Sequence, residues 1–269
     1  MRKARITILT THVDLHGDRF APEGLESTAA GINCRYLPLT VEHDLRIPPI
    51  GRIVSAEVTS LPDGEHAIEA DVEIFEENDT PEVLAGDGRT VRISLDDIPT
   101  FIAEFDRSYE SESGQRTLAA LRSLSPTSKT TPVVKKAVEP ISMLIIAGGV
   151  FAFAAVATGF LNKLGSDLYD GLKKTLAGHF AGTSESKLLD FRFTTVHEED
   201  FVEVHVLVEN PTPEVLESLF TSNFGGLDIF LSGIDPAELA IVRLVLKYKD
   251  DRLILLYALR KDCVPLTQR

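Results

Sequence analysis

The chain has no tryptophan, only two cysteines and two methionines, and few cations for its length. Its 269 residues include 27 Lys and Arg against 41 Asp and Glu, which gives a formal net charge of −14. Because a nucleic-acid-binding protein needs clustered cations to neutralise phosphates, this balance argues against nucleic acid as a partner. Cys34 and Cys263 lie far apart, so we expect neither a disulfide framework nor a thiolate metal site, which fits a reducing compartment.

The bulk composition is that of an ordinary globular protein, with 43% hydrophobic and 25% charged residues. A chain of this length has room for two small domains, or for one domain with appendages. The first residues are basic, but no long apolar core follows them. We therefore expect a first strand at the N-terminus and not a signal peptide.

Residues 1–106 read as a small β-rich domain. Short segments rich in β-branched residues are separated by Gly, Pro, Asn and Asp clusters, and several alternate apolar with polar residues. In "HAIEADVEIF" the apolar side chains of residues 68, 70, 72 and 74 share one face, which is typical of a strand with one wet face. Thr80 and Pro81 predict the start of a short helix. We expect a small antiparallel β-barrel, or a sandwich, with a helix or two.

Residues 107–134 are rich in Ser and Thr, and we expect a linker. A segment from 135 to 182 follows, in which Ile141 to Leu161 form a stretch without a charged residue. Such a length matches the hydrocarbon core of a bilayer, and the leucines after it predict an amphipathic helix. The sequence therefore predicts an apolar helical segment that crosses or binds a membrane, and its small residues would also suit a homo-oligomer.

Residues 183–269 read as a small α+β recognition or assembly domain. Two strand patterns over residues 187–210 predict a hairpin, and a second hairpin is expected around Asp250 and Asp251. Thr212 and Pro213 predict a helix start, and "LDIFLS" is interpreted as a strand. We find no nucleophile–base pair in this domain, and His205 is interpreted as a surface or sheet histidine.

Two motifs in the first domain resemble one protein family. "VDLHGDRFAPEGLES", followed by "PLTVEHD" and "PPIGRI", resembles the start of the phage prohead (capsid-maturation) serine proteases, whose fold is like that of the herpesvirus assembly protease. The resemblance covers about residues 5–100. The matching positions are Asp14, Gly17, Asp18, Pro22, His43, Asp44, Pro49 and Gly51.

The resemblance implies that His43 is a catalytic base and that Ser94, on a later strand, is the nucleophile. A serine hydroxyl needs a neighbouring imidazole to take its proton, and the imidazole needs a third group to fix its tautomer. His66, Glu69 and the acids after Ser94 all remain open for that third role. Asp96 and Asp97 follow Ser94 closely, where carboxylates would oppose a developing oxyanion.

Two functions therefore stand side by side. The first is a membrane-associated serine endopeptidase that acts on a protein substrate, with self-processing in the linker as one outcome. The second is a catalytically inactive scaffold, a membrane effector or adaptor that binds protein partners. We expect no cofactor and no metal, although His12, Asp14, His16 and Asp18 alternate in a pattern that could also bind zinc. The expected location is a membrane, with the N-terminal domain on its cytoplasmic side.

Overall fold

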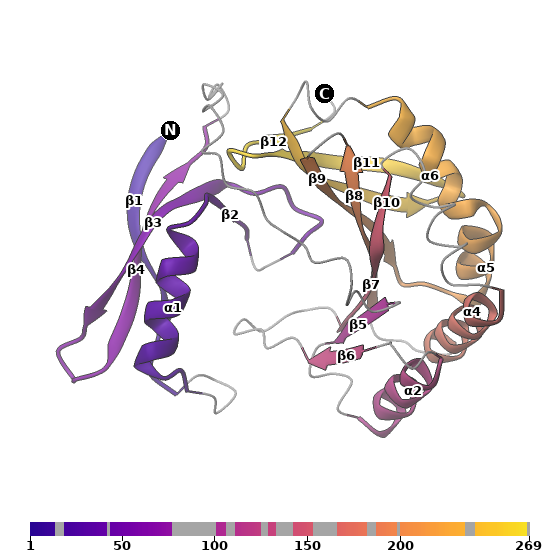
Figure 1. Ribbon diagram of the computed structural model, residues 1–269, viewed down its shortest axis with the longest axis horizontal. Helices are drawn as coiled ribbons and strands as arrows, with labels where there is room; N and C mark the ends of the chain where they lie inside the picture. The colour runs from indigo at the N-terminus through magenta and orange to yellow at the C-terminus, as the bar shows by residue number, and fades with distance from the viewer. Residues whose placement is uncertain are drawn as a thin grey trace. The chain divides into compact units, whose positions relative to one another are not determined.

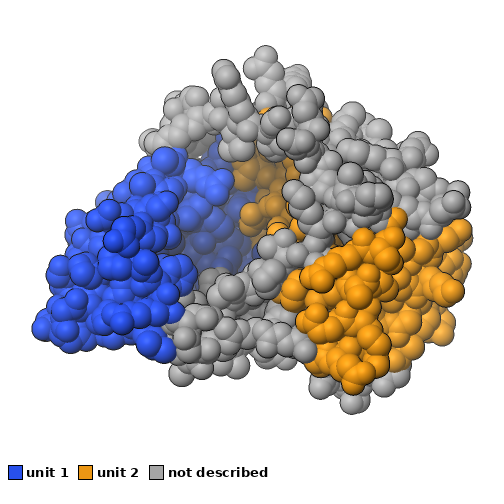
Figure 2. Space-filling view, turned by 60° about the horizontal axis from the view of Figure 1, so that its bottom comes forward, with its two compact units in different colours: residues 1–89, 259–266 blue, residues 90–258, 267–269 orange. Residues whose placement is uncertain are grey.

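The computed structural model describes residues 1–13, 19–41, 44–76, 101–105, 111–124, 129–132, 142–152, 166–181, 187–197, 200–234 and 240–267. Within them the chain forms five helices and twelve strands, arranged in a four-stranded and an eight-stranded sheet (Figure 1). The chain divides into two compact units (Figure 2). Unit 1 comprises residues 1–89 and 259–266, and unit 2 comprises residues 90–258 and 267–269.

Unit 1 is built on a sheet with the strand order β1-β4-β3-β2, and all its neighbouring strands are antiparallel. One helix, α1, lies against one face of this sheet (Figure 1). The elements are β1 (Arg2–Thr10), α1 (Pro22–Ile32), β2 (Leu37–Leu39), β3 (Gly51–Ser60) and β4 (His66–Ile74).

The core of unit 1 lies between α1 and the apolar face of the sheet. Leu25 of α1 is fully buried, as are Ile68 and Ala70 of β4. The predicted alternation in β4 is therefore confirmed, because Ile68, Ala70 and Val72 belong to this core and the acidic residues between them do not. Fully burying one such aliphatic side chain contributes about 1.5–3 kcal/mol, so these few positions hold the helix on the sheet.

The end of α1 is tied to β3 by an asparagine. Asn33 Nδ2 donates to the carbonyl of Ala56, and the Ala56 N–H donates to Asn33 Oδ1, both at 2.8 Å. The side-chain amide thus pairs with a backbone as a neighbouring strand would. This pairing satisfies part of the β3 edge that short β2 leaves open.

The eight-stranded sheet has the order β12-β11-β10-β9-β8-β7-β5-β6, and apart from residues 259–266 it lies in unit 2. Its parallel pairs are β5–β6, β7–β8 and β9–β10, each joined through helices, while β5–β7 and β8–β9 are antiparallel. Helices α2, α4, α5 and α6 lie along one face of the sheet (Figure 1).

The elements of the second half of the chain complete the list. They are β5 (Phe101–Phe105), α2 (Glu112–Ser123), β6 (Lys129–Pro132), β7 (Ser142–Ala152), α4 (Ser166–Phe180), β8 (Lys187–His197), β9 (Asp200–Glu209), α5 (Pro213–Thr221), α6 (Asn223–Ser232), β10 (Ile241–Lys249), β11 (Arg252–Arg260) and β12 (Pro265–Leu266).

Aromatic side chains pack the helices onto the sheet of unit 2. Phe191 and Phe193 of β8 contact Phe224 edge-on, with ring centroids 5.2 and 5.4 Å apart. Phe220 of α5 contacts Phe191 at 5.6 Å in the same way. Edge-to-face pairs add about 0.5–1.5 kcal/mol to the burial of their area. Since the odd-numbered residues of β8 face the helices, its even-numbered residues must face the other way.

The predicted mixed α+β class is confirmed, but two of its details are wrong. In unit 1 the described strands form an open sheet that ends at β1 and β2, and not the predicted small barrel. The predicted helix over 141–161 is wrong for 142–152, which form β7 between β5 and β8. Leu144, Ile145 and Ile146, which alternate between the two faces of β7, are all buried. Strands that are buried on both faces are continuous apolar runs and need no charged residue. Gly148 and Gly149 also disfavour a helix.

Among the described helices, none is both long enough and apolar enough to cross a membrane. The predicted linker, 107–134, contains α2 and β6. One of its serines, Ser111, accepts from the Gly114 N–H at 3.2 Å and caps α2, whose Leu118 and Leu121 are fully buried.

Several sequence expectations for the C-terminal part hold. Strands β8 and β9 form the predicted hairpin, and Thr212 caps α5 by accepting from the Val215 N–H at 3.3 Å. Asp250 and Asp251 both have positive φ, 52° and 58°, as a two-residue hairpin turn requires. The prediction that "LDIFLS" forms a strand is wrong, because this segment belongs to α6. The buried residues Phe224, Leu227 and Leu231 of α6 recur at helical spacing.

Candidate functional site

The two predicted catalytic residues, His43 and Ser94, lie outside the described residues, but the chain that flanks His43 is well defined. The Ile50 N–H donates to the carbonyl of Leu39 at 2.9 Å and closes the loop at its base. On the far side of His43, the Asp44 N–H donates to the carbonyl of Val41 at 3.0 Å. The loop that connects β2 with β3 is therefore anchored on both sides of the histidine.

Asp44, the residue after His43, forms hydrogen bonds with Arg46. The Arg46 N–H donates to Asp44 Oδ1 at 2.9 Å, and Arg46 Nε donates to the same oxygen at 2.8 Å. A carboxylate gripped twice by one arginine is held in place and has its charge compensated. Asp44 is thus a structural acid of the loop, and a third group for His43 would have to come from elsewhere in the chain.

The other sequence candidates in unit 1 also have local partners. Glu69 accepts from the Thr7 hydroxyl and lies near Arg5 on the wet face of the sheet. His66 begins β4, and its backbone N–H donates to Thr11 Oγ1 at 2.9 Å. His12 Nε2 lies 2.7 Å from Asp63 Oδ2. Asp14, His16 and Asp18, the remaining members of the predicted zinc pattern, lie outside the described residues.

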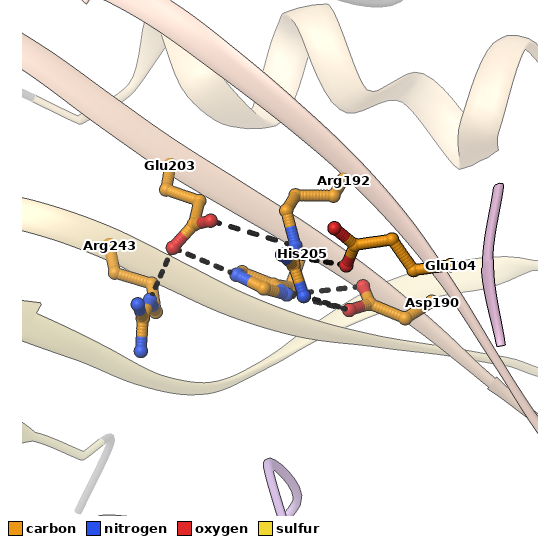
Figure 3. Close-up of polar contacts among 6 residues, drawn as sticks. All are labelled: Glu104, Asp190, Arg192, Glu203, His205 and Arg243. Carbon is orange, nitrogen blue, oxygen red and sulfur yellow. Dashed lines mark hydrogen bonds and ion pairs between the residues drawn. The ribbon is translucent and has the colours of Figure 1, made fainter. Parts of the chain in front are cut away.

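A more complete polar site lies on the sheet of unit 2, on the face turned away from the helices. The register places Arg192 of β8 opposite His205 of β9, and Arg243 of β10 opposite Glu203. Asp190 lies two residues before Arg192 and therefore on the same face. Glu104 reaches the group from β5 (Figure 3). We call these six residues the charged network.

His205 is the centre of the charged network (Figure 3). Its Nδ1 lies 3.1 and 2.9 Å from the two carboxylate oxygens of Asp190. Its Nε2 lies 3.1 Å from Glu203 Oε2, close enough for an ion pair but off the line of a well-aligned hydrogen bond. Asp190 is fully buried and His205 is 1% exposed. A buried imidazole is therefore held between two carboxylates.

Two arginines surround this core. Arg243 Nε donates to Glu203 Oε2 at 2.6 Å. Arg192 lies 3.4 Å from Asp190, 3.6 Å from Glu203 and 3.6 Å from Glu104. Three carboxylates thus face two guanidiniums and one imidazole. The charges cancel, three against three, only when the imidazole is protonated.

The pKa values follow from this arrangement. Burial by itself would lower the pKa of His205, but the negative charges of Asp190 and Glu203 and the hydrogen bond to Asp190 raise it above 6.5. Burial would raise the pKa of Asp190, yet His205 and Arg192 lower it below 3.8. Glu203 has its pKa lowered far below 4.5 by His205, Arg243 and Arg192, again against the effect of burial. The pKa of each of the three groups is thus shifted in the direction that favours its charged form.

Such an arrangement limits the chemistry that the network can perform. A protonated imidazole has no lone pair with which to accept a proton or to bind a metal. The carboxylates on both sides are occupied by cations. Among the residues that the structure describes, no group of three His, Cys, Asp or Glu side chains could hold a metal ion. The charged network is thus suited to fixing the sheet and not to general base catalysis.

A second histidine site lies where α2, α4 and β8 meet. Thr117 Oγ1 lies 2.9 Å from His179 Nδ1, and Lys187 Nζ lies 3.4 Å from His179 Nε2. An ammonium group only donates, so Nε2 must present its lone pair and Nδ1 must carry the proton. Thr117 then donates onward to the carbonyl of Ser113 at 3.2 Å. Burial and the charge of Lys187 lower the pKa of His179 to about 4.

The sequence predicts a surface or sheet histidine at His205, which is buried in the sheet, and it does not single out Asp190 or Glu203. A signal was present, however. In "LLDFRFTTV" and "VEVHVLV" the charged residues alternate with apolar ones, and the predicted hairpin brings these two faces together. A charged residue at each of four same-face positions on one hairpin predicts ion pairs across the strands. That Glu104 and Arg243 also belong to the charged network cannot be predicted from the hairpin, because it depends on which strands lie beside β8 and β9 in the sheet.

Comparison of the chain with protein-family models, with curated proteins and with solved structures finds no match.

Proposed function

We propose that the chain is a serine endopeptidase of the prohead-protease type, in which His43 is the general base and Ser94 the nucleophile. His43 would take the hydroxyl proton of Ser94 while the oxygen attacks the scissile carbonyl carbon. It would then give that proton to the departing amine, and water would release the acyl group. The substrate would be a protein segment in extended conformation.

One observation supports this proposal: the described residues on both sides of His43 are held by hydrogen bonds. A catalytic base must be held in a fixed position, because a displacement of about 1 Å can cost two orders of magnitude in rate. The hydrogen bond from Ile50 to Leu39 closes the loop, and the Arg46–Asp44 pair stiffens the residues directly after the histidine.

The test is labelling of the purified chain with a fluorophosphonate, which reacts covalently with an activated serine. The proposal expects labelling of the wild type and its loss in both Ser94→Ala and His43→Ala. Ser55→Ala and His12→Ala are the matched controls, since both residues lie in unit 1 and have their own partners, Asp71 and Asp63. Circular dichroism spectra and melting curves verify the folding of each variant.

A second candidate function is the catalytically inactive scaffold that binds protein partners. The specific observation in its favour is the pair Asp96 and Asp97 after Ser94, since carboxylates beside an oxyanion raise its energy. No labelling of well-folded wild-type chain would favour this candidate. A cellular activity that is unchanged in Ser94→Ala would favour it as well.

Membrane association stays a prediction of the apolar segment as a whole. Part of that segment, 142–152, is strand β7, so a helix through these residues does not support it. Flotation of the chain with vesicles of neutral and of anionic lipid tests the prediction directly. Chain that stays at the bottom of the gradient with both kinds of vesicle would remove membrane association from the account.

A further inference from the structure

Both ring nitrogens of His205 face groups that can only accept hydrogen bonds. Nδ1 lies 2.9 Å from one oxygen of Asp190, and Nε2 lies 3.1 Å from an oxygen of Glu203. A neutral imidazole would turn a lone pair toward one of these carboxylates, which is repulsive. The geometry therefore requires a proton on each nitrogen.

We infer that His205 is a proton-operated clamp between β8 and β9. Its proton holds Glu203 of β9 in place, 3.6 Å from Arg192 of β8, and loss of the proton releases Glu203 from both His205 and Arg192. This device is independent of the proposed endopeptidase activity. It is carried by three features of the charged network: the two carboxylates that flank the ring, the burial of the ring, and the charge balance.

The charged groups that face His205 come from four strands. Asp190 and Arg192 lie on β8, Glu203 on β9, Arg243 on β10 and Glu104 on β5. Strand β7 contributes only apolar residues at the matching positions, Ile145 and Ala147. Without the imidazole proton this group carries three negative and two positive charges. An uncompensated charge in a buried site is costly, so the network must rearrange.

The difference in burial between the two carboxylates decides which contact breaks. Asp190 has no exposed surface, whereas the side chain of Glu203 is 27% exposed. Glu203 also has an alternative partner in Arg243, at 2.6 Å. When the proton on Nε2 leaves, His205 therefore keeps its Nδ1–H bond to Asp190, and Glu203 turns toward Arg243 and solvent.

The direction of the pH effect follows from linkage. Asp190 and Glu203 raise the pKa of His205 above its ordinary 6.5. A raised pKa stabilises the folded state fully below 6.5, and this contribution is lost as the pH rises toward the raised value. The clamp is thus closed below pH 6.5 and opens as the pH rises through the raised pKa of His205.

Hydrogen exchange, measured by mass spectrometry on peptides that cover β8 and β9, tests the clamp in the full chain. As the pH rises above 6.5, intrinsic-rate-corrected protection should fall by up to about tenfold per pH unit, and it should level off once the pH exceeds the raised pKa of His205. Glu203→Gln should level off at a lower pH, because one of the two carboxylates that hold the proton is gone. His205→Gln should show no such slope, and His12→Gln, in unit 1, should behave as the wild type.

Two results would overturn the inference. One is protection of β8 and β9 in the wild type that stays constant as the pH rises above 6.5. The other is an equal fall in wild type and His205→Gln, which would place the titrating group elsewhere. Should His205→Gln fail to fold, Glu203→Gln decides alone, since an unmoved pH profile in that variant contradicts the clamp.

Discussion

Unit 2 holds two histidines beside the same strand, β8, in opposite states of charge. His205 is almost fully buried and yet protonated, whereas His179 is only half-buried and neutral. Burial disfavours the charged form at both sites, so it cannot explain the difference. The sign of the neighbours does: Asp190 and Glu203 flank His205, and Lys187 faces His179.

The comparison also separates two ways of tying a helix or strand to a sheet. The charged network joins strands on the face without helices, and its strength comes from compensated charge. The His179 site joins α2 and α4 to β8 by a chain of hydrogen bonds that runs from the Lys187 ammonium group through neutral His179 and Thr117 to the carbonyl of Ser113. Removing one charge from the charged network should therefore lower the free energy of unfolding strongly. Removing one hydrogen bond from the His179 site should lower it only modestly.

The largest expected effect is that of Asp190→Asn, which leaves a buried imidazolium without its main partner. Breaking one side of a buried ion pair costs about 3 kcal/mol or more. Asp71→Asn is the matched control, because Asp71 is a strand aspartate whose side chain is 57% exposed. Its cost should stay within about 0.5 kcal/mol. Denaturant unfolding of both variants measures this, and equal costs would contradict the importance assigned to Asp190.

A smaller effect is expected when the charge that faces His179 is removed. In Lys187→Met the pKa of His179 should rise from about 4 toward 6.5, and it should remain below 6.5 because burial persists. The control is Lys173→Met on α4, whose lysine pairs with Glu217. Titration of the His179 ring by NMR follows the change, and an unmoved pKa in Lys187→Met would rule out Lys187 as a cause.

The same lowered pKa predicts an acid-side loss of stability. Below pH 6.5 the unfolded chain takes up a proton at His179 while the folded chain does not, until the pH reaches about 4. The contribution of His179 is therefore complete above 6.5 and declines between 6.5 and about 4. Lys187→Met should narrow the pH range over which stability is lost, because it brings the folded-state pKa of His179 closer to 6.5. Unfolding measured as a function of pH would show this change. Charged His205 predicts the opposite, an alkaline-side loss.

The smallest effect concerns the threonine that accepts from His179. Thr117→Val removes this acceptor and also the bond from Thr117 to the carbonyl of Ser113. Thr28→Val isolates the second loss, because Thr28 makes the same kind of bond, to Gly24 at 2.8 Å, without a histidine. The difference between the two variants should be about 1 kcal/mol in unfolding free energy. Indistinguishable costs would show that the contact with His179 adds nothing.

Local signals in the sequence predict a good part of this fold. The alternation in β4 and the Thr212–Pro213 start of α5 depend on neighbouring residues alone, and both are confirmed. Local signals do not show whether the apolar run that contains β7 is a strand or a helix, because a buried central strand and an apolar helix have similar hydropathy. Only its position between β5 and β8 decides between them.

The candidate site was less accessible to prediction, for a related reason. Residues 190–205 show which side chains share a face of the hairpin, but the protonation state of His205 depends on partners from four strands. Glu104 and Arg243 reach the site from β5 and β10, which are distant in sequence. The predicted roles of His43 and Ser94 rest on the resemblance to the prohead proteases and stay predictions.

Long-range ¹H–¹⁵N NMR spectra of the histidine rings, recorded on the full chain at about pH 7.5, test the central claim most directly. Variants His205→Gln and Glu203→Gln assign the signals of His205, and Lys187→Met assigns those of His179. The account predicts that both ring nitrogens of His205 carry protons, while His179 is neutral with its proton on Nδ1. A neutral His205, or a protonated His179, would contradict it.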